Sequence, residues 1–132
     1  MRWISKRALL LLHDESLAQH GGASGIRDDG LLESAMARPE NLLAYGSPDR
    51  ARGSPDLAEL AASYAYGLAK NHPFVDGNKR AALLATGLFL ALNGQRLVVA
   101  QAEATVMVLD LAAGEITEAA LADWLRAHLR SR

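Results

Sequence analysis

Apolar residues recur at helical spacing along most of the chain, and this periodicity predicts a helical protein. The clearest case is residues 56–71, where Leu57, Leu60, Tyr64 and Leu68 lie three or four positions apart. Similar patterns predict further helices over residues 6–19, 31–37, 78–92, 102–113 and 117–129.

Capping and helix-breaking residues indicate where several of these helices begin and end. Ser5 is a typical N-cap for the first helix, and the pair Gly21-Gly22 is expected to end it. Pro39 disfavours helical geometry at the residue before it, so we expect the helix that begins at residue 31 to stop before Pro39. Residues 39–46 can then add a separate turn of helix.

The helix predicted at residues 78–92 has no charged residue between Ala81 and Leu92. A helix that is apolar on every side is typically buried, and this run is too short to span a bilayer. We therefore expect an all-α bundle around this central helix. The segments "RWIS" (residues 2–5) and "RLVV" (residues 96–99) have strand character and are expected to pair as a minor two-stranded β element.

Length and composition agree with a single helical domain over residues 1–132. Half of the 132 residues are hydrophobic and few are aromatic, which favours helices packed on helices. The segment "SPDRARGSP", residues 47–55, is polar and contains two prolines, so we expect a flexible connection there.

Charge and cysteine content exclude several classes of function. The net charge of −1 argues against a protein that coats nucleic acid, because phosphate binding requires a basic face. Only the tail at residues 126–132 is locally basic, and it is expected to be a solvated helix end. There is no cysteine, which excludes disulfides and thiolate metal sites. The apolar run at residues 8–12 is too short for a signal peptide or a membrane span, so we expect no membrane partner and a cytoplasmic location.

The densest set of polar and reactive groups, "HPFVDGNKR" at residues 72–80, immediately precedes the apolar helix. The first backbone N–H groups of a helix have no partners within it, and the helix dipole makes this end positive. Gly77 would let a ligand approach the backbone closely, and Lys79 and Arg80 add two cations beside Asn78. These four residues are predicted to bind a polyanion such as the phosphates of a nucleotide.

Two further side chains complete a candidate catalytic set. Asp76 lies beside the predicted phosphate site, where a carboxylate is the usual means of holding Mg²⁺. His72 is suited to move a proton at neutral pH and is predicted to be a general base. Each residue has an ordinary alternative, because Asp76 can cap the helix, Lys79 and Arg80 can be solvated, and His72 can form a hydrogen-bonded helix end. Their combination in one short stretch favours the site.

The same stretch resembles the signature loop of the Fic/Doc superfamily, whose pattern is His-x-Phe-x-Asp/Asn-Gly/Ala-Asn-Gly/Lys-Arg. Residues 21–39, "GGASGIRDDGLLESAMARP", and "GEI" at residues 114–116 are similar to the death-on-curing (Doc) toxins. The superfamily transfers part of a nucleoside triphosphate to a protein hydroxyl. The resemblance implies that His72 activates the hydroxyl, that Asp76 holds Mg²⁺, and that the phosphates bind at Gly77, Asn78, Lys79 and Arg80.

Two positions depart from the pattern of the superfamily members that transfer AMP. Lys79 stands where that pattern has a second glycine, and Leu83 stands where it has a second arginine. A lysine side chain takes space in the phosphate site, and loss of the arginine removes a bidentate clamp. Doc toxins share the lysine, and the resemblance to them implies a kinase that passes the γ-phosphoryl group of ATP to elongation factor Tu and arrests translation. AMP transfer to a protein hydroxyl and a non-enzymatic antitoxin-binding module remain alternatives.

A separate antitoxin chain is the expected inhibitor. Fic proteins that inhibit themselves resemble one another in a Ser/Thr-x-x-x-Glu-Gly/Asn helix, and this string does not occur in the chain. We expect an antitoxin segment that folds onto a groove of this protein.

The other notable residues are expected to be structural or have no assigned role. Three histidines lack metal-ligand spacing and are predicted to be surface or helix-end residues: His13, His20 and His128. Two aromatic residues are predicted to lie in the core and on the flank of their helix: Tyr64 and Tyr66. Three residues near the stretch that is similar to Doc toxins have no assigned role: Glu33, Arg38 and Tyr45.

Overall fold

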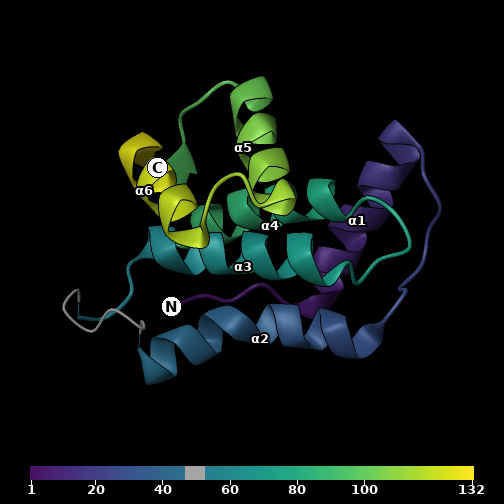
Figure 1. The fold of residues 1–132 in the computed structure, drawn as a ribbon, viewed down its shortest axis with the longest axis horizontal. Helices are drawn as coiled ribbons and strands as arrows, with labels where there is room; N and C mark the ends of the chain where they lie inside the picture. Colours follow the sequence, from purple (N-terminus) through teal and green to yellow (C-terminus); the bar gives the residue numbers. More distant parts are fainter. Residues whose placement is uncertain (47–52) are drawn as a thin grey trace.

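The computed structural model of the protein describes residues 1–46 and 53–132, which form six helices and one small sheet. The elements, shown in Figure 1, are α1 (Lys6–His20), α2 (Asp29–Tyr45), α3 (Leu57–Asn71), α4 (Asn78–Leu92), β1 (Gln95–Leu97), α5 (Gln101–Ala113), α6 (Glu118–His128) and β2 (Leu129–Ser131). The predicted helical bundle with a minor two-stranded element is thus confirmed. Most of the flexible connection expected at residues 47–55 lies outside the described residues. Within these ranges, no helix combines the length and the hydropathy that a membrane crossing requires.

Helix α3 is the centre of the bundle (Figure 1). It lies between α2 and α4, and it also contacts α5 and α6. Most of its buried residues are alanine or glycine, which lets neighbouring helix backbones approach closely. At Gly67, for example, a Cβ atom would lie only 3.1 Å from the Cα atom of Ala35 in α2. All six described helices contribute to one continuous apolar core around α3.

Helix α4 has the predicted bounds, but it is less enclosed than α3. Leu83, Leu84 and Leu88 are only half-buried, and Gly87 is exposed. The absence of charge made this helix the expected centre of the bundle. Helix α3 carries its charged residues near its ends, and between residues 60 and 69 every residue except Tyr66 is buried, so α3 takes the central place instead.

A single helix, α2, covers both segments that we expected Pro39 to separate, so that expectation is wrong. Pro39 lies inside α2 and is buried. A proline inside a helix removes one hydrogen bond and costs about 3 kcal/mol. Leu32, Ala35 and Met36 are also buried in this helix. Burying a large apolar side chain contributes about 1.5–3 kcal/mol, so packing against the core offsets the cost of the proline.

The predicted strand at residues 96–99 is observed slightly earlier, as β1, and its partner is not the expected one. β1 pairs antiparallel with β2, and Leu97 lies opposite Leu129. The basic tail, expected to be a solvated helix end, therefore provides the second strand of the sheet.

The N-terminal segment at residues 2–5 is not a strand, because side chains satisfy its backbone. The side-chain amide of Asn93 accepts a hydrogen bond from the N–H of Arg2 and donates one to its carbonyl, both at 2.9 Å. The N–H of Ile4 donates to the hydroxyl of Tyr64 at 3.2 Å. These bonds replace the ladder that a paired strand would make.

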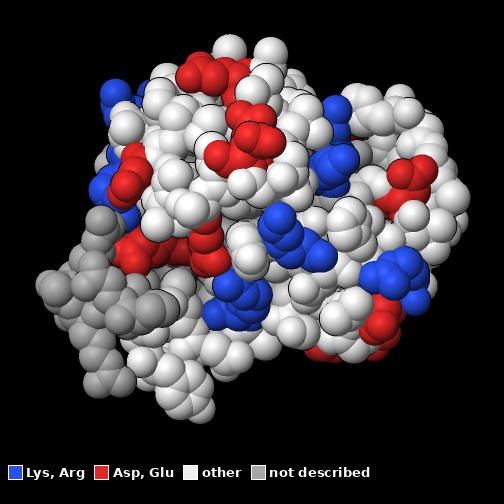
Figure 2. All heavy atoms as spheres, in the orientation of Figure 1, with Lys and Arg blue, Asp and Glu red and all other residues white. Residues whose placement is uncertain are grey.

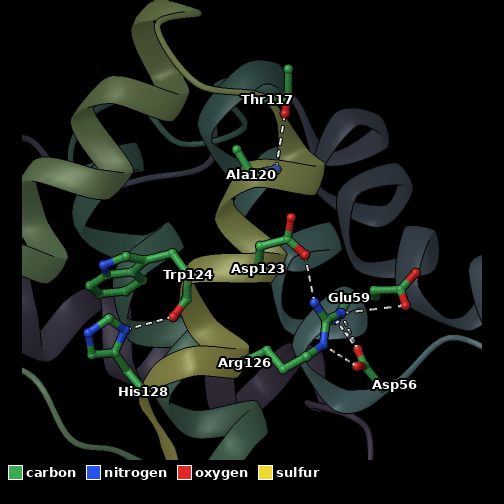
Figure 3. A network of polar contacts seen from close by, with 8 residues as sticks. All are labelled: Asp56, Glu59, Thr117, Ala120, Asp123, Trp124, Arg126 and His128. Atoms are coloured by element: carbon green, nitrogen blue, oxygen red, sulfur yellow. Dashed lines mark hydrogen bonds and ion pairs between the residues drawn. The ribbon is translucent and has the colours of Figure 1, made fainter.

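Arg126 ties α6 to the start of α3, as Figure 3 shows. Its guanidinium donates to both carboxylate oxygens of Asp56, at 2.6 and 3.1 Å, and to Asp123 at 2.7 Å. Glu59 lies 3.7 Å away. Asp56 also caps α3 by accepting a hydrogen bond from the backbone N–H of Glu59 at 2.9 Å.

Charged side chains of both signs are interspersed on the face seen in Figure 2, in keeping with the net charge of −1. This face is therefore not the continuous basic surface that nucleic acid requires.

Candidate active site

The predicted site lies on the turn between α3 and α4, at one end of the bundle (Figure 1). His72 ends α3 with a φ of 48° and a ψ of 55°, and it is the only non-glycine residue with a positive φ in the described ranges. Pro73 follows and disfavours helical geometry at His72, which stops the helix here. The left-handed conformation costs a non-glycine residue about 1–2 kcal/mol, so neighbouring contacts must hold it.

Arg27 provides part of this support. Its Nε atom donates to the carbonyl of His72 at 2.6 Å, and its Nη2 atom donates to the carbonyl of Asn71 at 2.9 Å. The last carbonyls of a helix have no partners within it, and the dipole makes that end negative, so a cation is favourable there. We did not identify Arg27 from the sequence. The sequence did offer one indication: α3 ends before Pro73 without a glycine cap, so its last carbonyls need a hydrogen-bond donor from elsewhere in the chain.

The loop between α1 and α2 runs antiparallel to the turn and fixes its backbone. The N–H of Val75 donates to the carbonyl of Gly25 at 3.0 Å, and Ile26 pairs with Phe74 in an isolated β-bridge. This connecting segment therefore positions the candidate site.

The start of α4 is the exposed positive helix end that the sequence predicts. Its N-cap is Gly77, with a φ of 77°, and no side chain in the described part of the chain caps the first turn. The backbone N–H groups of that turn consequently have no acceptor within the helix. Lys79 is exposed and Arg80 is half-buried, and neither forms an ion pair with another described residue.

The side chain of Asn78 is engaged by the turn itself. Its Oδ1 atom accepts a hydrogen bond from the N–H of Phe74 at 2.9 Å, and its Nδ2 atom donates to the carbonyl of the same residue at 3.0 Å. The side chain of Asn78 thus closes the turn. Its backbone N–H, at the start of α4, remains available to a phosphate.

Asp76 is exposed, and backbone N–H groups orient its carboxylate. Oδ1 accepts from the N–H of Gly77 at 2.8 Å, and Oδ2 accepts from the N–H of Ala23 at 3.3 Å. Gly22 permits this approach, because a Cβ atom there would lie 2.9 Å from Oδ2. The carboxylate is thus held in place by neutral groups, and no ion pair with a described residue occupies it.

The donor set around Asp76 fits magnesium. Among the described residues, no three His, Asp or Glu side chains gather as a protein-only metal cluster. Mg²⁺ commonly binds through one or two carboxylates together with substrate phosphates and water. One oriented carboxylate beside an exposed helix end meets that requirement.

The imidazole of His72 is exposed and has no hydrogen-bond partner among residues 1–46 and 53–132. It is therefore accessible to a hydroxyl that approaches from another molecule.

His13 is buried against the turn, so its expected place on the surface is wrong. It is 2% exposed, its Nε2 atom donates to the carbonyl of Asp76 at 2.8 Å, and its ring stacks on Phe74 with 3.8 Å between centroids. The sequence signal was its spacing of four residues from Leu9, which places both on the buried side of α1. The other two histidines lie as expected: His20 at an exposed helix end and His128 in the last turn of α6.

A small hollow of about 170 Å³ adjoins the turn, and its lining includes Lys79, Arg80 and Leu83. Leu83, which stands where the AMP-transferring pattern has an arginine, contributes apolar surface to it. A larger hollow of about 630 Å³ between α2, α3 and α6 includes no residue of the turn.

Arg38 lines the larger hollow and joins three helices. It donates to the carbonyl of Ser63 at 3.0 Å and to Glu118 at 2.9 Å, and its guanidinium lies 4.7 Å from the centre of the Tyr66 ring. The other two unassigned residues also lie away from the turn: Glu33 accepts a hydrogen bond from Lys6, and Tyr45 is exposed beside the hollow. Tyr64 is buried and Tyr66 half-buried, as predicted.

Comparison with known proteins gives both a family match and close relatives. The family model described as "Fic/DOC family" matches residues 3–90. The chain is 36% identical over 126 residues to "Protein kinase doc" of Escherichia phage P1. The aligned region covers 96% of this chain and 94% of that protein. It is also 44% identical over 77 residues to "Toxin Doc" of Mycolicibacterium smegmatis. This aligned region covers 58% of this chain and 55% of that protein.

Proposed function

The chain belongs to the Fic/Doc family, and on this premise we propose that it is the toxin of a toxin–antitoxin system and transfers the γ-phosphoryl group of ATP to a protein hydroxyl. One observation carries the proposal. The turn from His72 to Arg80 joins an exposed histidine, an oriented carboxylate and an uncapped helix end with two cations. The relatives named as a protein kinase and as a toxin support it.

The polar groups of the turn divide the tasks of this reaction. The phosphates bind at the N–H groups of the first turn of α4, beside Lys79 and Arg80. Asp76 would hold Mg²⁺, which when bound neutralises phosphate charge. His72 accepts the proton of the attacking hydroxyl as its oxygen bonds to the γ-phosphorus, and the bond to the leaving ADP breaks.

Lys79 and Leu83 favour phosphoryl transfer over AMP transfer. In the family members that transfer AMP, a glycine and an arginine at these positions make room for a phosphate and clamp it. Here a lysine fills the first position and an apolar side chain lines a hollow at the second. The nucleotide then binds with its γ-phosphate, rather than its α-phosphate, next to His72.

We further propose elongation factor Tu in the cytoplasm as the target, and a separate antitoxin chain as the inhibitor. Both proposals rest on the resemblance to Doc toxins and on the relatives of that name. Phosphorylation of an elongation factor would arrest translation, so a cell needs the antitoxin as a stoichiometric control.

Mass spectrometry of a bacterial extract incubated with the purified protein and Mg-ATP tests the proposal. We expect one modified protein, elongation factor Tu, which has gained a phosphoryl group. A modified protein that has gained AMP would show instead that the enzyme transfers AMP. If no protein is modified while the chain is toxic on expression, it acts instead by binding.

A further inference from the structure

We propose that His13 is a positioning residue for the candidate active site, which holds the peptide between Asp76 and Gly77 in the orientation that the site requires. His13 comes from α1, more than fifty positions before the turn, and touches no substrate in the mechanism above. The inference rests on the proposed function only where it predicts the effect of His13 on the reaction. Its effect on the turn can be measured without any activity.

The hydrogen bond fixes the tautomer of His13. A carbonyl oxygen can only accept, so the Nε2 atom, which lies 2.8 Å from the carbonyl oxygen of Asp76, must carry the proton. The ring is 2% exposed, so water does not compete for this bond. The same ring stacks on Phe74 at an interplanar angle of 13°, and the backbone of Phe74 is itself held by Asn78.

Gly77 explains why such a restraint is needed. The positive φ of Gly77 favours glycine, and a Cβ atom there would lie 3.2 Å from the Nε2 atom of His13. Glycine, however, also lets the preceding peptide rotate easily. Rotation would exchange the directions of the Asp76 carbonyl and the Gly77 N–H.

The two ends of this peptide are held from opposite sides. His13 binds its carbonyl, and the carboxylate of Asp76 binds its N–H at 2.8 Å. Without His13, the peptide could turn over, which would release the carboxylate and change the direction of the first turn of α4. The proposed Mg²⁺ ligand and the proposed phosphate donors thus depend on a side chain outside the signature loop.

Two variants separate the two contacts of His13. His13→Phe keeps a ring to stack on Phe74 but removes the donor. His13→Gln keeps an N–H donor at a similar distance from the backbone but removes the ring. The matched control is His128→Phe, because His128 also donates a ring N–H to a carbonyl, that of Trp124 at 2.7 Å, and its ring contacts the ring of Trp124 (Figure 3). His128 belongs to α6, outside the turn between α3 and α4.

Amide hydrogen exchange on the folded proteins tests the positioning role directly. We expect His13→Phe to exchange faster than the parent in peptides that cover residues 73–80, with the core of α3 unchanged. His13→Gln should lie closer to the parent, and His128→Phe should match the parent in these peptides. Parental exchange rates in His13→Phe would overturn the inference, whatever the activity of the protein.

Kinetics of phosphoryl transfer give the second measurement. A misplaced reacting group can cost about 10²-fold, so we expect kcat of His13→Phe to fall by about 10- to 10²-fold, with partial recovery in His13→Gln. A parental kcat in folded His13→Phe would also overturn the inference. If the parent itself transfers no group, the proposed function fails, and the exchange experiment still decides the role of His13.

The parent protein provides a test that needs no variant. Long-range ¹⁵N NMR spectra distinguish the two neutral tautomers of a histidine. We expect the Nε2-protonated form of His13, and the Nδ1-protonated form would contradict the hydrogen bond on which the inference rests.

Discussion

Two charged regions of the molecule, the turn between α3 and α4 and the cluster around Arg126, use charge in opposite ways. In the cluster, the guanidinium of Arg126 meets the carboxylates of Asp56, Asp123 and Glu59 (Figure 3). Every charged group of the cluster therefore has an opposite charge within 4 Å, and the ion pairs join two helices.

The turn holds its charged groups with neutral ones. Backbone N–H groups orient the carboxylate of Asp76, and Lys79 and Arg80 have no ion-pair partner among the described residues. The fold thus orients the carboxylate of Asp76 without neutralising it, and it leaves the two cations unpaired within the described ranges. Because these charges have no partner within the described part of the protein, they can pair with a ligand, and this difference supports the proposal that the turn is the functional region.

The largest effect is expected from loss of the base. Removing a general base typically lowers a rate by about 10²- to 10⁴-fold, so His72→Ala and His72→Gly should both lose transfer activity by this amount. His72→Gly should be at least as stable as the parent in urea unfolding, because glycine adopts a φ of 48° without strain. A folded His72→Ala protein with parental activity would remove His72 from the mechanism.

A similar loss is expected when a cation of the turn is removed, and no loss when a cation of the cluster is removed. Loss of one preorganised donor costs about 10²- to 10³-fold in kcat, which we expect for Arg80→Ala. The control, Arg126→Ala, should keep parental kcat. Equal activity of the two variants in a transfer assay would abolish the distinction between the two regions.

A smaller loss is expected from Gly77→Ala. The positive φ of Gly77 costs alanine about 1–2 kcal/mol, and the new Cβ atom would press on His13. Gly114→Ala is the control, since Gly114 caps α5 with a similar φ of 80° but lies at another helix end. Thermal unfolding should show a loss of stability in both, which is at least as large in Gly77→Ala, whereas kcat should fall, by about 10-fold or more, only in Gly77→Ala.

The smallest effect is the loss of stability in Arg126→Ala. Arg126 is 38% exposed, and exposed ion pairs contribute about 0.2–1 kcal/mol each. We expect the free energy of unfolding to fall by about 1 kcal/mol, and by less in high salt, because salt screens surface charges. A loss that is independent of salt would indicate packing rather than charge.

The sequence predicts helices well where periodicity and capping residues agree, as in α1, which Ser5 caps at its start and Gly21 at its end. It fails at Pro39, where burial of a whole helix face outweighs the local cost of a proline. It also fails for the strand at the N-terminus, because Asn93 and Tyr64 satisfy that backbone from distant positions. Such long-range side-chain contacts leave no periodic signal.

In the candidate site too, local features can be predicted from the sequence and long-range contacts cannot. The reactive groups stand together in one stretch of nine residues, so their identity can be predicted from sequence. The residues that hold this stretch in shape, His13 and Arg27, come from α1 and from the loop that follows it. Their roles depend on how the helices pack, and neither residue matches a chemical motif.

Transfer from ATP labelled at a chosen phosphate tests the central claim most directly. Purified protein, Mg²⁺ and elongation factor Tu are incubated with either γ-labelled or α-labelled ATP, and His72→Ala serves as the control for contaminating kinases. We expect label on the elongation factor from γ-labelled ATP only, and none with His72→Ala. Label from α-labelled ATP would contradict the assignment of a kinase and show that AMP is transferred instead.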